Sequence, residues 1–122
     1  MNEILTGSDS EIEFTLTGSN GLPLDLSGTA SVLVVLTQSI KTIGKFATVA
    51  TTGYNDTDTE ITDEPNGVFV VRLNSSLTDG LDQTYINAEI AVNVTNGDYE
   101  DGIFTQKVTA EKIAIVRKSK IS

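Results

Sequence analysis

The chain has 122 residues and a formal net charge of −9 at pH 7, from 17 acidic and 8 basic residues. Its length fits one domain. It contains no cysteine and no histidine, which excludes disulfides, thiolate metal sites, cysteine nucleophiles and a Ser-His-Asp triad. Its acidity argues against binding to a phosphate backbone, and its longest apolar run, Val32 to Leu36, is too short for a transmembrane helix. We therefore expect neither a nucleic-acid partner nor a membrane partner.

The first half of the chain contains strand patterns of two kinds. Residues Ile12 to Leu16 alternate apolar and polar side chains, which predicts a half-buried strand. Asn20 and Gly21 favour a turn, and Pro23 prevents an immediate central strand. The run from Val32 to Leu36 is apolar on both faces and predicts a central strand, and a weaker pattern over 43–51 predicts another strand.

The turn after the first of these strands has a predictable geometry. Leu24 and Leu26 flank Asp25 at a period of two, so both leucines are expected to face the core while Asp25 faces solvent. The Asp25 carboxylate is then placed to accept a hydrogen bond from Ser27 or a nearby backbone N–H.

In the second half of the chain, strands alternate with polar connectors. The expected elements are a loop over 52–66 with a short strand at 59–62, a strand over 68–73, one helical turn within 76–81, and strands over 85–94 and 103–110 that pair as a hairpin. The apolar residues then change phase between Ala110 and Ile113, which predicts either a β-bulge near Glu111 and Lys112 or a switch of the chain to the other sheet there. Seven or eight strands separated by turn signals predict an all-β sandwich or barrel.

Acidic residues gather in the middle of the chain, and one metal site can be drawn there. Asp56, Asp58 and Glu60 present alternate oxygen ligands, which is the type of ligand that Ca²⁺ prefers. The loop lacks the glycine and the glutamate of an EF-hand, so a solvated acidic loop is the favoured interpretation. We expect no metal, no cofactor and no small-molecule substrate.

Three tyrosines support an alternative function. Tyr54, Tyr85 and Tyr99 could stack on sugar rings in a carbohydrate-binding or adhesive module, with Ca²⁺ bound by the acidic loop. Ordinary loop and strand-edge tyrosines are the favoured interpretation. Catalysis is disfavoured because no motif compensates for the missing histidine and cysteine.

The order of the turn and strand signals resembles a known family. The residues that carry the likeness are Gly7 to Leu16, then Asn20 to Ala30, then Asn66 to Leu73, followed by a connector at 77–80 and a closing hairpin. Together they resemble the small immunoglobulin-like domains of bacteriophage virions, and most of all the N-terminal domain of phage upper baseplate proteins. The resemblance implies an immunoglobulin-like antiparallel β-sandwich, no catalytic residues, and a non-enzymatic structural role in a tailed-phage virion assembled in the host cytoplasm.

Five of the eight basic residues lie in the last sixteen positions. The sequence divides into an N-terminal arm (1–6), a sandwich (7–116) and a basic C-terminal arm (117–122). We expect the arms to contact other virion proteins, including copies of this chain, in the tail, baseplate, neck or capsid surface. The expected contact residues are Ile4, Leu5, Arg117, Lys118, Lys120 and Ile121.

Overall fold

The computed structural model describes residues 2–18 and 20–121, and for residues 29 and 30 it describes the backbone alone. The described residues form eight strands and one short helix. In chain order these are β1 (Asn2–Leu5), β2 (Ser10–Thr15), β3 (Thr29–Gln38), β4 (Lys41–Ala47), β5 (Thr59–Asp63), β6 (Val68–Leu73), α1 (Ser75–Asp79), β7 (Tyr85–Thr95) and β8 (Ile103–Arg117). The prediction of an all-β chain with seven or eight strands is confirmed.

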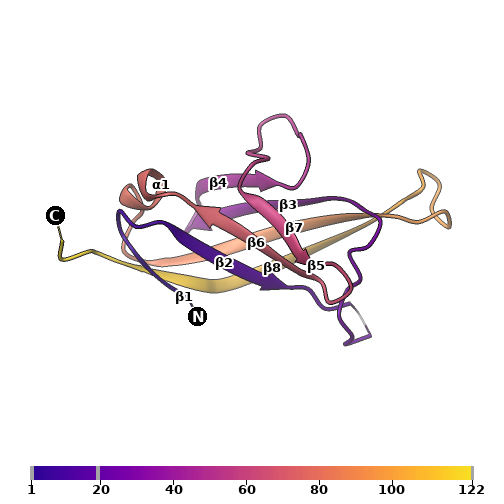
Figure 1. Ribbon diagram of the computed structural model, residues 1–122, viewed down its shortest axis with the longest axis horizontal. Helices are drawn as coiled ribbons and strands as arrows, with labels where there is room; N and C mark the ends of the chain where they lie inside the picture. Colours follow the sequence, from indigo (N-terminus) through magenta and orange to yellow (C-terminus); the bar gives the residue numbers. More distant parts are fainter. Residues whose placement is uncertain (1, 19, 122) are drawn as a thin grey trace.

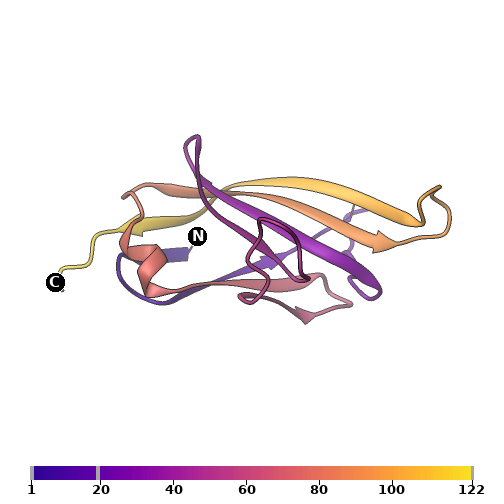
Figure 2. The same ribbon diagram turned by 90° about the horizontal axis from the view of Figure 1, so that it is seen from above.

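The strands form two sheets that face each other (Figures 1 and 2). One sheet has five strands in the order β1-β8-β7-β3-β4, and the other has three in the order β2-β6-β5. All neighbouring strands are antiparallel except β1 and β8, which are parallel. The chain is therefore a two-layer β-sandwich.

The core lies between the two sheets and follows the alternation of side chains along each strand. On β3, the inward residues Val32, Val34 and Leu36 are fully buried, and its two neighbours in the sheet are β4 and β7. The predicted central strand is thus confirmed. From the opposite sheet, Phe14 and Phe69 stack with ring centroids 4.9 Å apart, which fills the layer between the sheets.

The turn between β2 and β3 has the predicted geometry. Gly21 has a φ of +80°, and the backbone N–H of Ser27 donates to Oδ1 of Asp25 at 2.8 Å. That hydrogen bond holds the pKa of Asp25 below its ordinary value. Leu26 is buried and Leu24 packs against the core, as expected. Ser19, which the sequence also places in this turn, lies outside the described residues.

Gly67 locks this turn onto the start of β6. Its φ is +70°, and a Cβ atom built there would lie 2.6 Å from the Leu24 carbonyl oxygen and 2.7 Å from that of Leu16. The Gly67 carbonyl oxygen accepts a hydrogen bond from the Leu16 N–H at 2.9 Å. A side chain at position 67 is excluded both by the backbone conformation and by this close approach.

The predicted bulge is present in β8. Ala88 pairs with Ala110 and Ile86 with Ala114, so two steps along β7 match four along β8. Lys112 takes up the extra length at a φ of +53°, and its N–H donates to Oδ1 of Asn87 at 2.8 Å. Because the bulge inserts an even number of residues, the even-numbered residues of β8 face inward both before and after it.

That parity corrects one detail of the sequence prediction. The change of phase in the sequence suggested that Ile113 and Ile115 take over the inward positions after the bulge. Instead Ala114 and Val116 are fully buried, Ile113 packs against the core from within the bulge, and Ile115 is half-buried.

The predicted N-terminal arm is part of the sandwich. Residues Asn2–Leu5 pair in parallel with Ala114–Arg117 at the edge of the five-stranded sheet. The sandwich therefore runs from residue 2 to residue 117, rather than from 7 to 116. Met1 and Ser122, which the sequence assigns to the two arms, lie outside the described residues.

Candidate interaction surfaces

The two predicted arms come together at one end of the sandwich. The Thr6 N–H donates to the Arg117 carbonyl oxygen at 3.0 Å, and the Ser119 N–H donates to Oγ1 of Thr6 at 3.0 Å. Oγ1 of Thr78 in α1 donates to the Ser8 carbonyl oxygen at 2.7 Å. These bonds hold the β1–β2 turn, the C-terminal segment and α1 together, and we call this the α1 end.

A surface hollow lies between these segments. It is lined by the β1–β2 turn, the end of α1 and the C-terminal segment, through Leu5, Thr6, Gly7, Ser8, Asp79, Lys118, Ser119 and Ile121. Leu5 is 44% exposed and Ile121 is 87% exposed. The sequence placed these residues in separate arms, and the fold brings them to one site.

Ile4 is a correction to the predicted contact set. Its side chain is 1% exposed and belongs to the chain's own core. An inward position on a paired strand leaves it unavailable to another subunit, so it is not a contact residue. Arg117 is already engaged, since its Nε donates to Oε2 of Glu3 at 2.9 Å. Lys118 and Lys120 are exposed, and no ion pair involves them among residues 2–18 and 20–121.

The carboxylates of the acidic loop contact different partners. The Asp58 carboxylate accepts a hydrogen bond from Nδ2 of Asn55 at 2.8 Å, and Glu60 pairs with Arg72 instead of turning toward Asp56. Across the described part of the chain, no three acidic side chains lie close enough together to hold a metal ion. The carboxylates of the calcium alternative are therefore not brought together.

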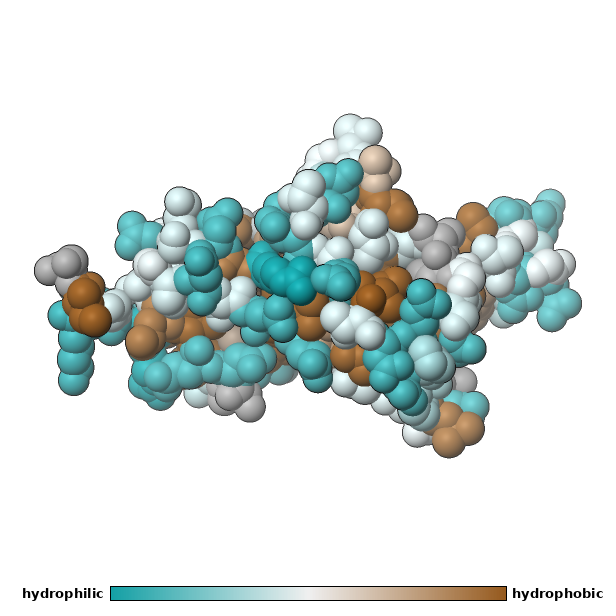
Figure 3. Space-filling view, viewed as in Figure 1, coloured by the Kyte–Doolittle hydropathy of each residue, from teal (hydrophilic) through white to brown (hydrophobic). Residues whose placement is uncertain are grey.

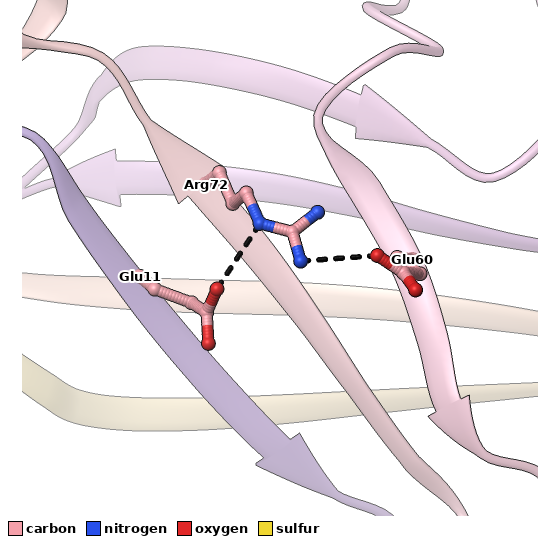
Figure 4. A network of polar contacts seen from close by, with 3 residues as sticks. All are labelled: Glu11, Glu60 and Arg72. Atoms are coloured by element: carbon pink, nitrogen blue, oxygen red, sulfur yellow. Dashed lines mark hydrogen bonds and ion pairs between the residues drawn. The ribbon is translucent and has the colours of Figure 1, made fainter.

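Arg72 organises the outer face of the three-stranded sheet (Figure 4). Its Nε donates to Oε2 of Glu11 on β2 at 3.1 Å, and its Nη2 donates to Oε2 of Glu60 on β5 at 3.0 Å. The three side chains are about half exposed. One cation thus joins the three strands of this sheet.

Each of the three tyrosines contacts a different residue of the chain. The Lys45 ammonium lies over the Tyr54 ring, 5.6 Å from the centroid of that ring, beside the outer face of the five-stranded sheet. Tyr85 lies under Lys112 at 5.1 Å, at the beginning of β7, and Tyr99 follows the end of that strand. Tyr85 is the first residue of the 11-residue strand β7, and Tyr99 lies beyond its last residue, Thr95. At about 3.4 Å per residue, the length of the strand is too great for one sugar ring to contact both tyrosines.

The β7–β8 hairpin extends beyond the body of the sandwich (Figure 2). Its tip is held by main-chain and Asx-type hydrogen bonds: Asn96 N–H to the Gly102 carbonyl at 2.8 Å, Asp98 N–H to Oδ1 of Asn96 at 3.0 Å, and Ile103 N–H to Oδ1 of Asp101 at 3.0 Å. We call residues 96–103 the hairpin tip.

The hairpin tip presents aromatic, aliphatic and acidic groups together. Tyr99 is 47% exposed and packs on Phe104 with ring centroids 5.4 Å apart. Ile103 is also exposed, and the acidic residues Asp98, Glu100 and Asp101 are exposed in the same tip. From the sequence, this segment is expected to be the turn of a hairpin, with Tyr99 as an ordinary loop residue or a sugar-stacking one, because nothing local indicates that the apolar groups stay uncovered.

Most of the exposed large apolar side chains lie toward the two ends of the molecule. Toward the α1 end these are Leu5, Ile40, Tyr85 and Ile121, and at the opposite end Leu22, Tyr99 and Ile103, while Val49 is exposed in the loop between β4 and β5. In Figure 3 hydrophobic and hydrophilic atoms lie side by side on the projecting C-terminal segment at the left. Concentrations of this kind are typical of interaction sites.

Ile40 is the most exposed apolar side chain toward the α1 end, and no pattern in the sequence predicts its exposure. It is 101% exposed in the β3–β4 turn, next to Ser39 at a φ of +55°. Behind it, Gln38 is buried and its Nε2 donates to the Asp82 carbonyl oxygen at 2.7 Å. The turn is thus fixed in place while its isoleucine faces solvent.

No protein family model matches the chain, and no curated protein matches it either. Among the residues that the structure describes, no helix has the length and hydrophobicity needed to cross a bilayer.

Proposed function

We propose that the chain is a non-enzymatic structural component of a tailed-phage virion and that it acts through protein–protein contacts. The observation that carries the proposal is the placement of exposed apolar side chains at both ends of a well-packed sandwich. A lone domain gains nothing from exposing Ile40, Ile121 and Tyr99, whereas a subunit between neighbours buries them.

The strand order supports the immunoglobulin-like part of the proposal. Immunoglobulin variable-type domains join strands G, F, C and C′ in one sheet and strands B, E and D in the other. Here β8-β7-β3-β4 follow the first order and β2-β6-β5 follow the second. β1 adds an edge strand beside β8. The virion assignment itself rests on the resemblance of the turn and strand motifs.

The composition supports the non-enzymatic part. With no histidine or cysteine, acid–base chemistry would fall to carboxylates, lysines or tyrosines. The largest charged network, around Arg72, is solvent-exposed and satisfied by ion pairs. Such a network holds strands together more readily than it transfers protons.

The test is whether the chain is a constituent of virus particles. Particles from the phage or prophage that carries the gene would be purified by density gradient and analysed by quantitative mass spectrometry. The proposal predicts that the chain sediments with the particles in a fixed ratio to their other proteins. Its recovery only in the soluble fraction, with particles lacking it, would refute the virion assignment.

A further inference from the structure

We propose that two copies of this chain associate head to tail, with the hairpin tip of one copy seated in the hollow at the α1 end of the next. The inference deepens the proposed function, on which it rests, by naming a partner for the two ends. Each surface is part of the same chain, so every copy carries both halves of the contact.

The two surfaces lie at opposite ends of the molecule. In Figures 1 and 2 the β7–β8 hairpin projects at one end of the longest axis and the C-terminal segment at the other. A contact between two different surfaces of the same chain is heterologous, and it produces either closed rings or open filaments. Opposite placement keeps both surfaces accessible after the first contact has formed.

Charge complementarity selects a second copy as the occupant. The hairpin tip carries three acids within four residues, Asp98, Glu100 and Asp101, and no ion pair within the described chain neutralises them. The hollow is lined by Lys118, with Lys120 two residues further on. Asp79 also lines the hollow and offsets one of the two lysines, and Glu3 balances Arg117 nearby, which leaves an excess of one positive charge among these groups.

The apolar groups match in the same way. Tyr99 and Ile103 project from the tip, and Leu5 and Ile121 border the hollow. Docking would cover apolar side chains that the isolated chain leaves in water. Because hydrogen bonds hold both the tip and the β1–β2 turn, little conformational entropy is lost when they meet.

The experiment uses two full-length variants, each altered at one surface. Asp98→Lys with Glu100→Lys reverses the tip and leaves the hydrogen bond of Asp101 intact. Lys118→Glu with Lys120→Glu reverses the hollow. Sedimentation velocity over a concentration series at low salt measures association, and circular dichroism verifies that each variant is folded.

We expect the wild-type chain to form species larger than dimers as its concentration rises. Each variant alone should associate at least about tenfold more weakly, because like charges then face each other. An equimolar mixture of the two should regain association, in species that alternate the two variants. In that mixture the acidic tip of one variant faces the basic hollow of the other, and the basic tip faces the acidic hollow.

A matched control separates this contact from an effect of net charge. Glu13→Lys with Asp56→Lys changes the total charge as much as the tip variant does, on exposed residues away from both ends. It should associate like the wild type, and 1 M salt should weaken association of both because it shortens the Debye length to about 3 Å.

Three results would overturn the inference: a wild-type chain that stays monomeric throughout, a tip or hollow variant that associates alone as the wild type does, or a mixture of these two variants that fails to associate. A chain found in particles but monomeric in solution would contradict only this inference. A chain that associates head to tail but is absent from particles would contradict only the virion assignment.

Discussion

Replacement of Ile4 by alanine tests whether residues 2–5 belong to the sandwich or form a free arm. Ile4 is 1% exposed and packs in the core, whereas its neighbour Leu5 is 44% exposed on the opposite face of β1. The substitution Ile4→Ala removes about three methyl or methylene groups at about 0.8 kcal/mol each. With a cavity contribution, the free energy of unfolding should fall by about 3 kcal/mol.

The expected loss in the free energy of unfolding can be converted into a change in melting temperature. An unfolding entropy of about 2.1 cal/mol/K per residue gives about 0.26 kcal/mol/K for 122 residues. The loss of about 3 kcal/mol then lowers Tm by about 12 °C. The matched variant Leu5→Ala should cost less than about 1 kcal/mol, because its side chain already lies partly in water.

Urea unfolding followed by circular dichroism measures both variants on the same scale, and thermal unfolding gives Tm. Equal destabilisation by Ile4→Ala and Leu5→Ala would refute the reasoning. It would mean that β1 does not pair with β8 and that residues 1–6 form a free arm, as the sequence predicted.

Three further substitutions test the turns and the surface network. Gly67→Ala should destabilise the chain by about 2 kcal/mol or more in urea unfolding, because of its positive φ and the close carbonyl oxygens; Gly97→Ala, with open space around it, should change stability by less than about 0.5 kcal/mol. Asp25→Asn keeps the turn but removes the titratable carboxyl group. Because the pKa of Asp25 is lowered in the folded state, the wild type should be more stable to unfolding than the variant at pH values above the pKa of Asp25 in the unfolded chain. This difference in stability should vanish as the pH falls through the folded-state pKa. An advantage that grows on acidification would contradict that sign. Arg72→Met should lower the urea midpoint at low salt by much less than Ile4→Ala does, and the difference should shrink in 1 M salt; a loss unaffected by salt would mean that packing, and not the ion pairs with β2 and β5, carries the effect.

The strands with a regular alternation were predictable from the sequence, because their pattern is local. β7 is the clearest case, with Ile86, Ala88, Ile90 and Val92 all buried on one side. The hairpin with β8 followed from the turn residues, and the bulge followed from a break in the pattern. In each case the signal lies within a few residues of the feature that it predicts.

β1 could not be predicted from the sequence, because the strand that it pairs with lies at the other end of the chain. It is four residues long, only Ile4 is buried, and its partner is the last strand of the chain. A single buried residue gives no periodicity, and a parallel pairing of the two ends leaves no turn signal. The same limit applies to the surfaces. Leu5, Lys118 and Ile121 were proposed as contacts in separate arms, and only the fold shows that they line one hollow.

Electron cryomicroscopy of the assembled particle would test most directly whether the chain acts through contacts at its two ends. The account predicts density for the two-layer sandwich in which the hairpin tip and the α1 end are both buried against neighbouring subunits, with Tyr99 and Ile121 inside those contacts. A sandwich that is held by the outer faces of its sheets, with both ends in solvent, would contradict it.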